Sequence, residues 1–119
     1  MYCTKKEGCN GPVKPEITFF GEDLPEKFTK AKDDLKDADL LIIIGTSLAV
    51  SPFNMCVFQV PEKCPKVLIN MTNNADQGFE FDDPKKFPER LLLKGKSQET
   101  IKDISQDCGW IDELLSRKK

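Results

Sequence analysis

Three continuous apolar runs organise the second half of the chain. Each run holds three to five residues rich in leucine or β-branched side chains, at residues 40–44, 67–69 and 91–93, and the corresponding strands are expected over residues 40–44, 66–69 and 90–94. Strands without alternation between apolar and polar positions are buried on both faces, which is typical of a parallel sheet covered by helices. The pattern therefore predicts three strands of such a sheet.

Helical spacing marks the segment before the first run. Apolar side chains recur there at intervals of three or four residues, at Phe28, Ala31, Leu35 and Ala38. Asp23 suits the N-cap of this segment, and Pro25 is tolerated in a first turn. We therefore predict a helix over residues 24–36, and a second, short helix over residues 52–59.

The last segment is also predicted to be helical. Ser97 can cap it, and Gly109 can bend or interrupt it. Its apolar residues form one stripe, made of Ile101, Ile104, Cys108, Ile111, Leu114 and Leu115. Residues 1–16 and 72–89 are polar and favour loops, and residues 16–20 favour a short extended segment. The order strand, helix, strand, loop, strand, helix predicts an α/β fold with a parallel sheet.

Composition narrows the possible functions. The chain has 119 residues, enough for one domain, and a formal net charge of −2, which gives nucleic-acid binding no support. No apolar run approaches the ~20 residues that span a bilayer, and the start has no signal-peptide core. We expect an intracellular protein, in the nucleus or cytoplasm, without a membrane partner. Its five cysteines are then free thiols or metal ligands rather than a disulfide framework.

The chain contains no histidine. This excludes a Ser-His or Cys-His catalytic pair within these residues, and it excludes a histidine-ligated metal or an imidazole base. Any general base in the chain would have to be a carboxylate or a lysine. The cysteines at positions 56, 64 and 108 read as core or near-core thiols.

Small and polar residues follow all three predicted strands, at residues 45–47, 70–72 and 95–97. In open parallel sheets, ligands bind in the crevice outside the carboxyl ends of the strands. Glycine there lets a ligand approach the backbone, and hydroxyls and amides hydrogen-bond to ribose or phosphate oxygens. A nucleotide-type ligand is therefore one interpretation. The other is that these residues simply form turns. The chain has neither GxGxxG nor a P-loop motif.

Three segments resemble the sirtuin family in order and in spacing. They are residues 11–25 (GPVKPEITFFGEDLP), 39–53 (DLLIIIGTSLAVSPF) and 65–70 (PKVLIN), and the resemblance extends from about Cys3 to Trp110. It implies the C-terminal part of a sirtuin-type catalytic domain. Residues 1–15 would be a remnant of the zinc-binding module, and residues 16–119 a partial Rossmann-like parallel sheet with flanking helices. Sirtuins are NAD-dependent protein-lysine deacetylases, which transfer an acetyl group from acetyl-lysine to ADP-ribose and release nicotinamide.

The resemblance also implies site residues. Those expected to bind NAD are Gly45, Thr46, Ser47, Asn70, Met71, Thr72 and Ser97. Those expected to bind the acetylated peptide are Thr18, Phe19, Phe20, Gly21, Glu22 and Val50. Core packing is the alternative for the two phenylalanines, and helix capping is the alternative for Ser97. Cys3 and Cys9 match a pair of zinc ligands, but their spacing is C-x5-C instead of the family's C-x2-C, and structural zinc needs four ligands. Zinc is therefore expected only in a complete protein.

Three parts of the family pattern are not found in these residues. They are the Gly-Ala-Gly-x-Ser loop that grips the diphosphate, the histidine base and the first cysteine pair. We therefore expect no deacetylation by this chain alone, and we expect a partner polypeptide that supplies the N-terminal half. We also expect an unpaired sheet edge that promotes association. The alternatives are a short non-catalytic protein that binds acyl-lysine peptide or ADP-ribose, and an unrelated α/β nucleotide-binding domain.

Overall fold

The computed structural model describes residues 2–117, and the chain divides into two compact units between Ala31 and Lys32. The first unit contains mostly turns and irregular backbone. Residues 2 and 12 form an isolated antiparallel bridge there, and Ile17 N donates to Pro15 O over 2.8 Å. The predicted extended segment, residues 16–20, belongs to no strand of the described chain. Short polar loops of this kind have few apolar side chains to bury and depend on local hydrogen bonds.

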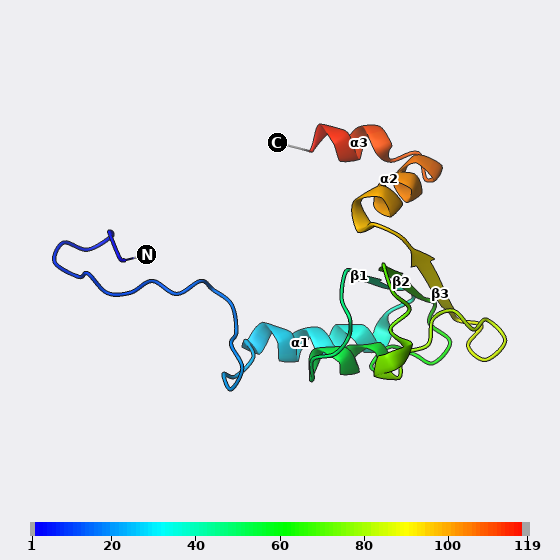
Figure 1. Cartoon of the computed structure of the whole chain (residues 1–119), viewed down its shortest axis with the longest axis horizontal. Coiled ribbons are helices and arrows are strands. Elements are labelled where there is room, and N and C mark those ends of the chain that lie inside the picture. The colour runs from blue at the N-terminus through cyan, green and yellow to red at the C-terminus, as the bar shows by residue number, and fades with distance from the viewer. Residues whose placement is uncertain (1, 118–119) are drawn as a thin grey trace. The chain divides into compact units, whose positions relative to one another are not determined.

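The second unit is built on a parallel sheet of three strands within residues 32–117 (Figure 1). The strands are β1 (Leu41–Ile44), β2 (Lys66–Asn70) and β3 (Arg90–Lys94), in the spatial order β1-β2-β3. Their register aligns Ile42 with Val67 and Val67 with Leu91. All three predicted strands, and the α/β class with a parallel sheet, are confirmed. The apolar runs specified the strands because each run offers side chains to both faces of the sheet.

One face of the sheet carries the core. Ile43 and Leu68 are buried on this face, and Leu41 and Leu92 pack beside them. The loops beyond the strands cover this face with a second set of buried side chains, namely Leu48, Val57, Phe79 and Phe81. The core therefore fixes the loop that follows β1 and the loop that follows β2, because Leu48 and Phe79 belong to those loops.

The other face of the sheet differs from the prediction. Ile69 is fully buried there, but Ile42, Ile44 and Leu91 are each about half exposed. The helix that follows β3 contacts β2, and no element of the described residues covers the outer side of β1. Burial on both faces is thus confirmed for β2 and wrong for β1 and β3. The apolar run alone could not show which neighbours cover each strand.

The predicted helices are confirmed with small differences at their ends. The first is α1 (Glu26–Asp34), which starts two residues later than predicted and continues as the 3-10 turn η1 (Leu35–Asp37). The short helix predicted over residues 52–59 is the 3-10 helix η2 (Phe53–Phe58). A further 3-10 turn, η3 (Ala75–Gln77), lies in the predicted loop.

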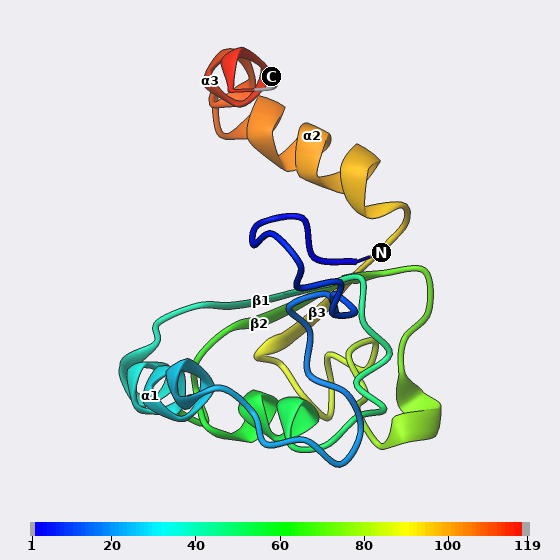
Figure 2. The same ribbon diagram turned by 90° about the vertical axis from the view of Figure 1, so that its left-hand side faces the viewer.

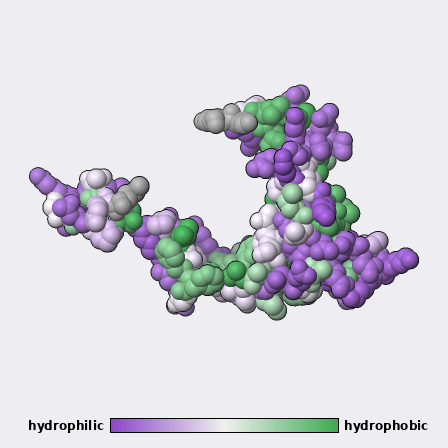
Figure 3. All heavy atoms as spheres, viewed as in Figure 1, coloured by the Kyte–Doolittle hydropathy of each residue, from purple (hydrophilic) through white to green (hydrophobic). Residues whose placement is uncertain are grey.

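Two helices follow β3 (Figure 2). They are α2 (Ser97–Asp107) and α3 (Ile111–Ser116), and Gly109 separates them with a positive φ of 72°. The predicted interruption at this glycine is confirmed. The apolar stripe of α3 stays open to solvent, as its green spheres indicate (Figure 3), and Leu115 and Trp110 are exposed.

The three cysteines of the second unit differ in how deeply they are buried. Cys64 is buried and Cys56 is half-buried, so the prediction of core or near-core thiols is confirmed for both. Cys108 is exposed, and its prediction is wrong, because it sits at the end of α2 on a stripe that no other element covers within residues 2–117. No helix in the described part of the chain has the length and apolar character needed to cross a membrane.

Candidate functional site

The carboxyl ends of the three strands meet at one edge of the sheet. The strand ladder continues into the loops, because Gly45 N donates to Ile69 O over 3.0 Å and Gly95 N donates to Asn70 O over 3.0 Å. Ser97 Oγ lies 3.7 Å from the position that a Cβ atom on Gly45 would occupy. The predicted cofactor segments therefore come together, although Gly45 and Ser97 are 52 positions apart in sequence.

The loop after β1 is a tight turn anchored in the core. Gly45 and Leu48 both have positive φ, of 63° and 57°, and Leu48 N donates to Thr46 Oγ1 over 3.1 Å. The side chain of Leu48 is buried in the core, whereas Ser47 is exposed. Glycine adopts a φ of 63° more readily than residues with a side chain, so Gly45 suits this turn.

The loop after β2 presents acceptor atoms. Asn70 Nδ2 donates to three oxygens of the same loop: Thr72 O at 3.3 Å, Thr72 Oγ1 at 3.2 Å and Asn74 Oδ1 at 3.0 Å. The amide nitrogen of Asn70 is therefore committed within the protein, which leaves its carbonyl oxygen to receive a donor from a ligand. Met71 and Thr72 are exposed beside it.

Ser97 does not cap α2. The helix begins at Ser97 itself, its N-cap is Lys96 with φ −71° and ψ 127°, and no side chain caps this end. The capping alternative for Ser97 is therefore wrong. Its hydroxyl instead lies near Gly45, at the meeting point of the β1 and β3 ends.

Sequence reasoning missed one residue of this edge, Asn74. Its side chain is buried and joins the loops after β1 and β2, since Nδ2 donates to Thr46 O over 2.9 Å. The residue also has a positive φ of 58°. Asparagine tolerates this left-handed conformation better than most residues, but Asn73 has the same side chain, so the sequence carried no signal that singled out Asn74.

The segment predicted to bind peptide lies in the first unit and is open to solvent. Phe20 is 92% exposed and Phe19 is 47% exposed, so the core-packing alternative is wrong for Phe20 and unsupported for Phe19. Glu22 closes the turn: its carboxylate accepts from Lys14 Nζ at 2.7 Å and from Phe19 N at 2.9 Å. These two donors, Lys14 first, lower the pKa of Glu22. Thr18 and Gly21 belong to the same exposed stretch, and Gly21 has a φ of 88°.

Val50 belongs to the second unit. Its side chain is about half exposed, and its carbonyl oxygen accepts from Asn54 N at 3.1 Å. The loop from Gly45 to Val50 thus carries an exposed apolar side chain directly after the turn that Leu48 anchors. Such a side chain can contact an extended peptide while the buried leucine holds the loop in place.

The thiols of Cys3 and Cys9 interact with each other. The backbone N–H of Lys5, the thiol of Cys9 and the backbone N–H of Lys6 lower the pKa of the Cys3 thiol. Cys3 N also donates to Gly11 O over 2.8 Å, which closes the loop between the two cysteines. Two neighbouring sulfurs could provide two of the four ligands of a tetrahedral zinc site. Residues 2–117 contain no group of three or more cysteine, aspartate, glutamate or histidine side chains arranged to hold a metal.

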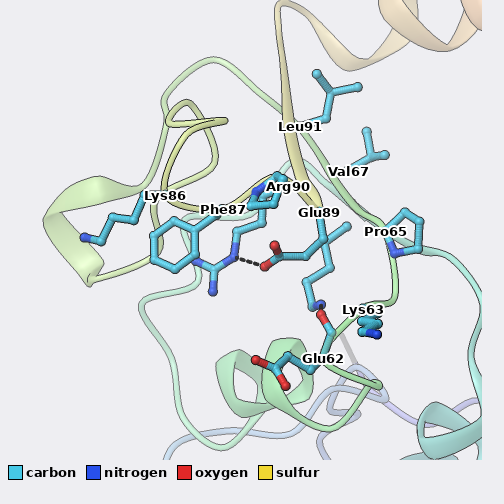
Figure 4. A pocket seen from close by; sticks show the side chains of 11 residues that line it. Glu62, Lys63, Pro65, Val67, Lys86, Phe87, Glu89, Arg90 and Leu91 are labelled. Carbon is cyan, nitrogen blue, oxygen red and sulfur yellow. Dashed lines mark hydrogen bonds and ion pairs between the residues drawn. The ribbon is translucent and has the colours of Figure 1, made fainter.

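A separate hollow of about 900 Å³ lies at the amino ends of β2 and β3 (Figure 4). It is lined by charged side chains, of which Lys66 and Arg90 are engaged within the protein. Lys66 Nζ donates to the carbonyl oxygens of residues 61, 62 and 64, and Arg90 stacks on the Phe87 ring at 3.8 Å and lies 3.3 Å from Glu89. Internally paired charges favour a structural role for this hollow.

Comparison with known proteins identifies relatives along most of the chain. The model of the Sir2 family matches residues 2–52. An NAD-dependent deacetylase, sir2A of Dictyostelium discoideum, is 41% identical over 94% of this chain and 22% of its own length. NAD-dependent protein deacetylase sirtuin-2 of Danio rerio is 37% identical over 92% of this chain and 32% of its own. NAD-dependent histone deacetylase SIR2 of Saccharomyces cerevisiae is 44% identical over 84% and 16%.

The chain thus spans less than a third of the length of these relatives. The matched family residues include the turn at Phe19–Glu22, the strand β1 and the loop that follows it. The relatives extend the match through the ends of β2 and β3. On these grounds the chain belongs to the Sir2 family, the sirtuins.

Proposed function

We propose that this chain forms the adenosine side of the NAD site, together with part of the acetyl-lysine peptide site, of an NAD-dependent protein-lysine deacetylase. The observation that carries the proposal is the meeting of the residues after β1, β2 and β3 at one sheet edge. In parallel α/β sheets this edge is where nucleotides bind. The relatives' names as NAD-dependent deacetylases support the same ligand. We also propose a nuclear or cytoplasmic location.

The chemistry of the edge fits a ribose. Gly45 would let the ligand approach the backbone of the β1 loop, with Thr46 and Ser47 beside it. The carbonyl oxygen of Asn70 would accept hydrogen bonds from ribose hydroxyls, because its amide nitrogen is already engaged. Met71, Thr72 and Ser97 would border the adenosine. NAD supplies the reactive group of the reaction, since nicotinamide leaves and ADP-ribose receives the acetyl group.

Each of the two units carries residues that we assign to binding the acetylated peptide. In the first unit, the exposed rings of Phe19 and Phe20 offer apolar walls for an acyl-lysine side chain, and Glu22 holds the turn that carries them. In the second unit, Val50 offers an exposed apolar side chain after the β1 loop. Main-chain pairing with an extended peptide would then give affinity that tolerates many substrate sequences. An acetylated protein or peptide is therefore the proposed partner.

Zinc would be shared with residues outside this chain. Cys3 and Cys9 would provide two thiolate ligands, and a structural zinc ion needs two more. We propose that the catalytic groups, like the zinc ligands, come partly from this chain and partly from residues outside it. The 119 residues have no histidine to act as general base and no glycine-rich loop for the diphosphate, so a longer polypeptide or a second chain would supply both. Loss of a general base alone slows a reaction by roughly 10²–10⁴-fold.

Two measurements on the 119-residue chain test the proposal. Isothermal titration should detect ADP-ribose, and an acetyl-lysine peptide should bind more tightly than the same peptide with free lysine. Incubation with NAD and the acetylated peptide should release no nicotinamide. Binding without release supports the proposal, whereas nicotinamide release would overturn the claim of inactivity. Failure to bind ADP-ribose would overturn the assigned nucleotide site.

A further inference from the structure

Asn74 is a buried amide held in an unusual backbone conformation. The residue is only 5% exposed, and its φ of 58° and ψ of 19° place it in the left-handed region. Asparagine adopts this region more readily than most residues other than glycine, and a buried amide left without partners would carry a desolvation penalty. The hydrogen-bond partners of the Asn74 side chain therefore indicate the role of this residue.

The Asn74 side chain joins the two loops that follow β1 and β2. Its Nδ2 atom donates to Thr46 O over 2.9 Å, and its Oδ1 atom accepts from Asn70 Nδ2 at 3.0 Å and from Thr72 Oγ1 at 3.1 Å. The backbone carbonyl of Asn74 accepts from Gln77 N at 3.0 Å and from Phe79 N at 3.3 Å. Because the Phe79 side chain is buried in the core, this network is anchored to the sheet.

These contacts decide which atoms the edge shows to a ligand. By accepting from Asn70 Nδ2, Asn74 turns the amide nitrogen of Asn70 inward and leaves the carbonyl oxygen outward. Asn74 Oδ1 also accepts the hydrogen bond that the Thr72 hydroxyl donates. The Thr72 oxygen can therefore only accept a hydrogen bond from a ligand. Asn70 and Thr72 thus present acceptor atoms at this edge, which suits a ligand that donates hydrogen bonds, such as a ribose with free hydroxyls.

We propose that Asn74 is a positioning residue of the NAD site, which fixes the Asn70 side chain and the Thr46 loop in the orientation that receives the ribose. This inference rests on the proposed function, because Asn70 and Thr46 are the ribose and loop residues assigned there. Asn74 itself need not touch the ligand. It acts through Asn70, and its removal should lower affinity without removing any group that contacts ADP-ribose.

The test compares Asn74→Gly with Asn73→Gly in the full 119-residue chain. Glycine accepts the left-handed conformation, so Asn74→Gly removes the side chain without adding backbone strain. Asn73 is a matched control: it also bonds through its side chain, to Asp82 at 2.8 Å and to Ala75 N at 3.2 Å, but it contacts neither Asn70 nor Thr46. Nuclear magnetic resonance of the ligand-free chain would follow the Asn70 side-chain amide, and calorimetry would follow ADP-ribose.

Asn74→Gly should shift the Asn70 side-chain amide signals, speed their solvent exchange about tenfold, and weaken ADP-ribose binding about tenfold, as expected for the loss of about 1.4 kcal/mol of hydrogen bonding. Asn73→Gly should leave all three within twofold. Unchanged Asn70 signals in Asn74→Gly would overturn the proposal, even if affinity fell. If the unmodified chain did not bind ADP-ribose, the proposed function would fail, while the ligand-free signals would still decide the role of Asn74.

A second variant covers the case in which Asn74→Gly does not fold. Asn74→Asp keeps the shape and the acceptor toward Asn70, but it places an oxygen against Thr46 O in place of the donor. The expected result is a shift of the Thr46 to Leu48 amide signals, with the Asn70 side-chain signals close to those of the unmodified chain. The opposite pattern, a changed Asn70 beside an unchanged Thr46 loop, would contradict the proposal.

Discussion

The two ends of the sheet differ in what they leave for a ligand. The amino ends of β2 and β3 carry Lys66, Arg90 and Glu89 around an open hollow, and these charges bond to one another or to backbone carbonyls. The carboxyl ends carry no buried charge, yet they expose Ser47, Thr72 and the carbonyl oxygen of Asn70. The difference is that the carboxyl ends leave hydrogen-bonding atoms unengaged, which is why we assign the proposed ligand site to them and not to the hollow.

The largest effect is expected from a side chain at Gly45. Gly45→Val places a β-branched residue at a φ of 63°, beside Ser97 Oγ and where a ligand would approach. ADP-ribose affinity should fall about 100-fold, measured by calorimetry. Gly78→Val is the control, because Gly78 also has a positive φ, of 77°, with no atom near its Cβ position. It should lose similar stability, about 1–2 kcal/mol, and keep its affinity; equal affinities in the two variants would contradict the account.

At the opposite end, Lys66→Met should change stability and not binding. Lys66 is 5% exposed, and its Nζ donates to three backbone carbonyls, at 3.3, 3.1 and 2.9 Å. Losing these charge-assisted bonds should lower the free energy of unfolding by about 2 kcal/mol, as seen in a urea titration. Lys63→Met in the same hollow removes an exposed lysine and should cost under about 0.5 kcal/mol. A loss of ADP-ribose affinity in Lys66→Met would contradict the claim that the amino ends of the strands take no part in binding.

The acceptor atoms of Asn70 and Thr72 predict that ADP-ribose binds more tightly than its 2′-phosphorylated form. A 2′-phosphate on the adenosine ribose replaces a donating hydroxyl with an anion that would face the acceptor atoms of Asn70 and Thr72. Its affinity should be about tenfold lower than that of ADP-ribose, since one hydrogen bond is lost and an acceptor meets a negative charge. Competition calorimetry with the two compounds measures the ratio. Equal binding would mean that the ribose hydroxyls do not meet Asn70.

The smallest effect concerns the exposed turn of the first unit. Lys14 and the Phe19 amide lower the pKa of Glu22, so the carboxylate form is favoured in the folded turn. Its contribution is complete above the unfolded pKa of about 4 and is lost as pH falls through the lowered folded value. The Phe19 amide signal should therefore move in an acid titration, and Glu22→Gln should abolish that step. A step that persists in Glu22→Gln would assign the titration to another group.

The sequence was sufficient where structure depends on local pattern. The apolar runs predicted β1, β2 and β3, and helical spacing predicted α1 and α2, because these signals are carried by neighbouring residues. The segments at the strand ends were also predictable, since parallel strands bring their carboxyl ends to one edge. The sirtuin motifs then named the residues at that edge.

What sequence could not show depends on contacts between distant residues. Asn74 bonds to Thr46, 28 positions away, and nothing in the local pattern separates it from Asn73, which turns toward Asp82. Lys66 is a charged residue that is nevertheless buried, because its ammonium group bonds to three backbone carbonyls that precede it in the chain. The half-exposed outer side of β1 likewise depends on which elements cover it, and not on its own apolar residues.

The most direct test of the account is to map ADP-ribose on the chain by nuclear magnetic resonance. The account predicts that amide signals shift at residues 45–47, 70–72 and 97, while those at residues 62–66 and 86–91 stay in place. Shifts centred on the hollow at the amino ends, with none at the carboxyl ends, would contradict it.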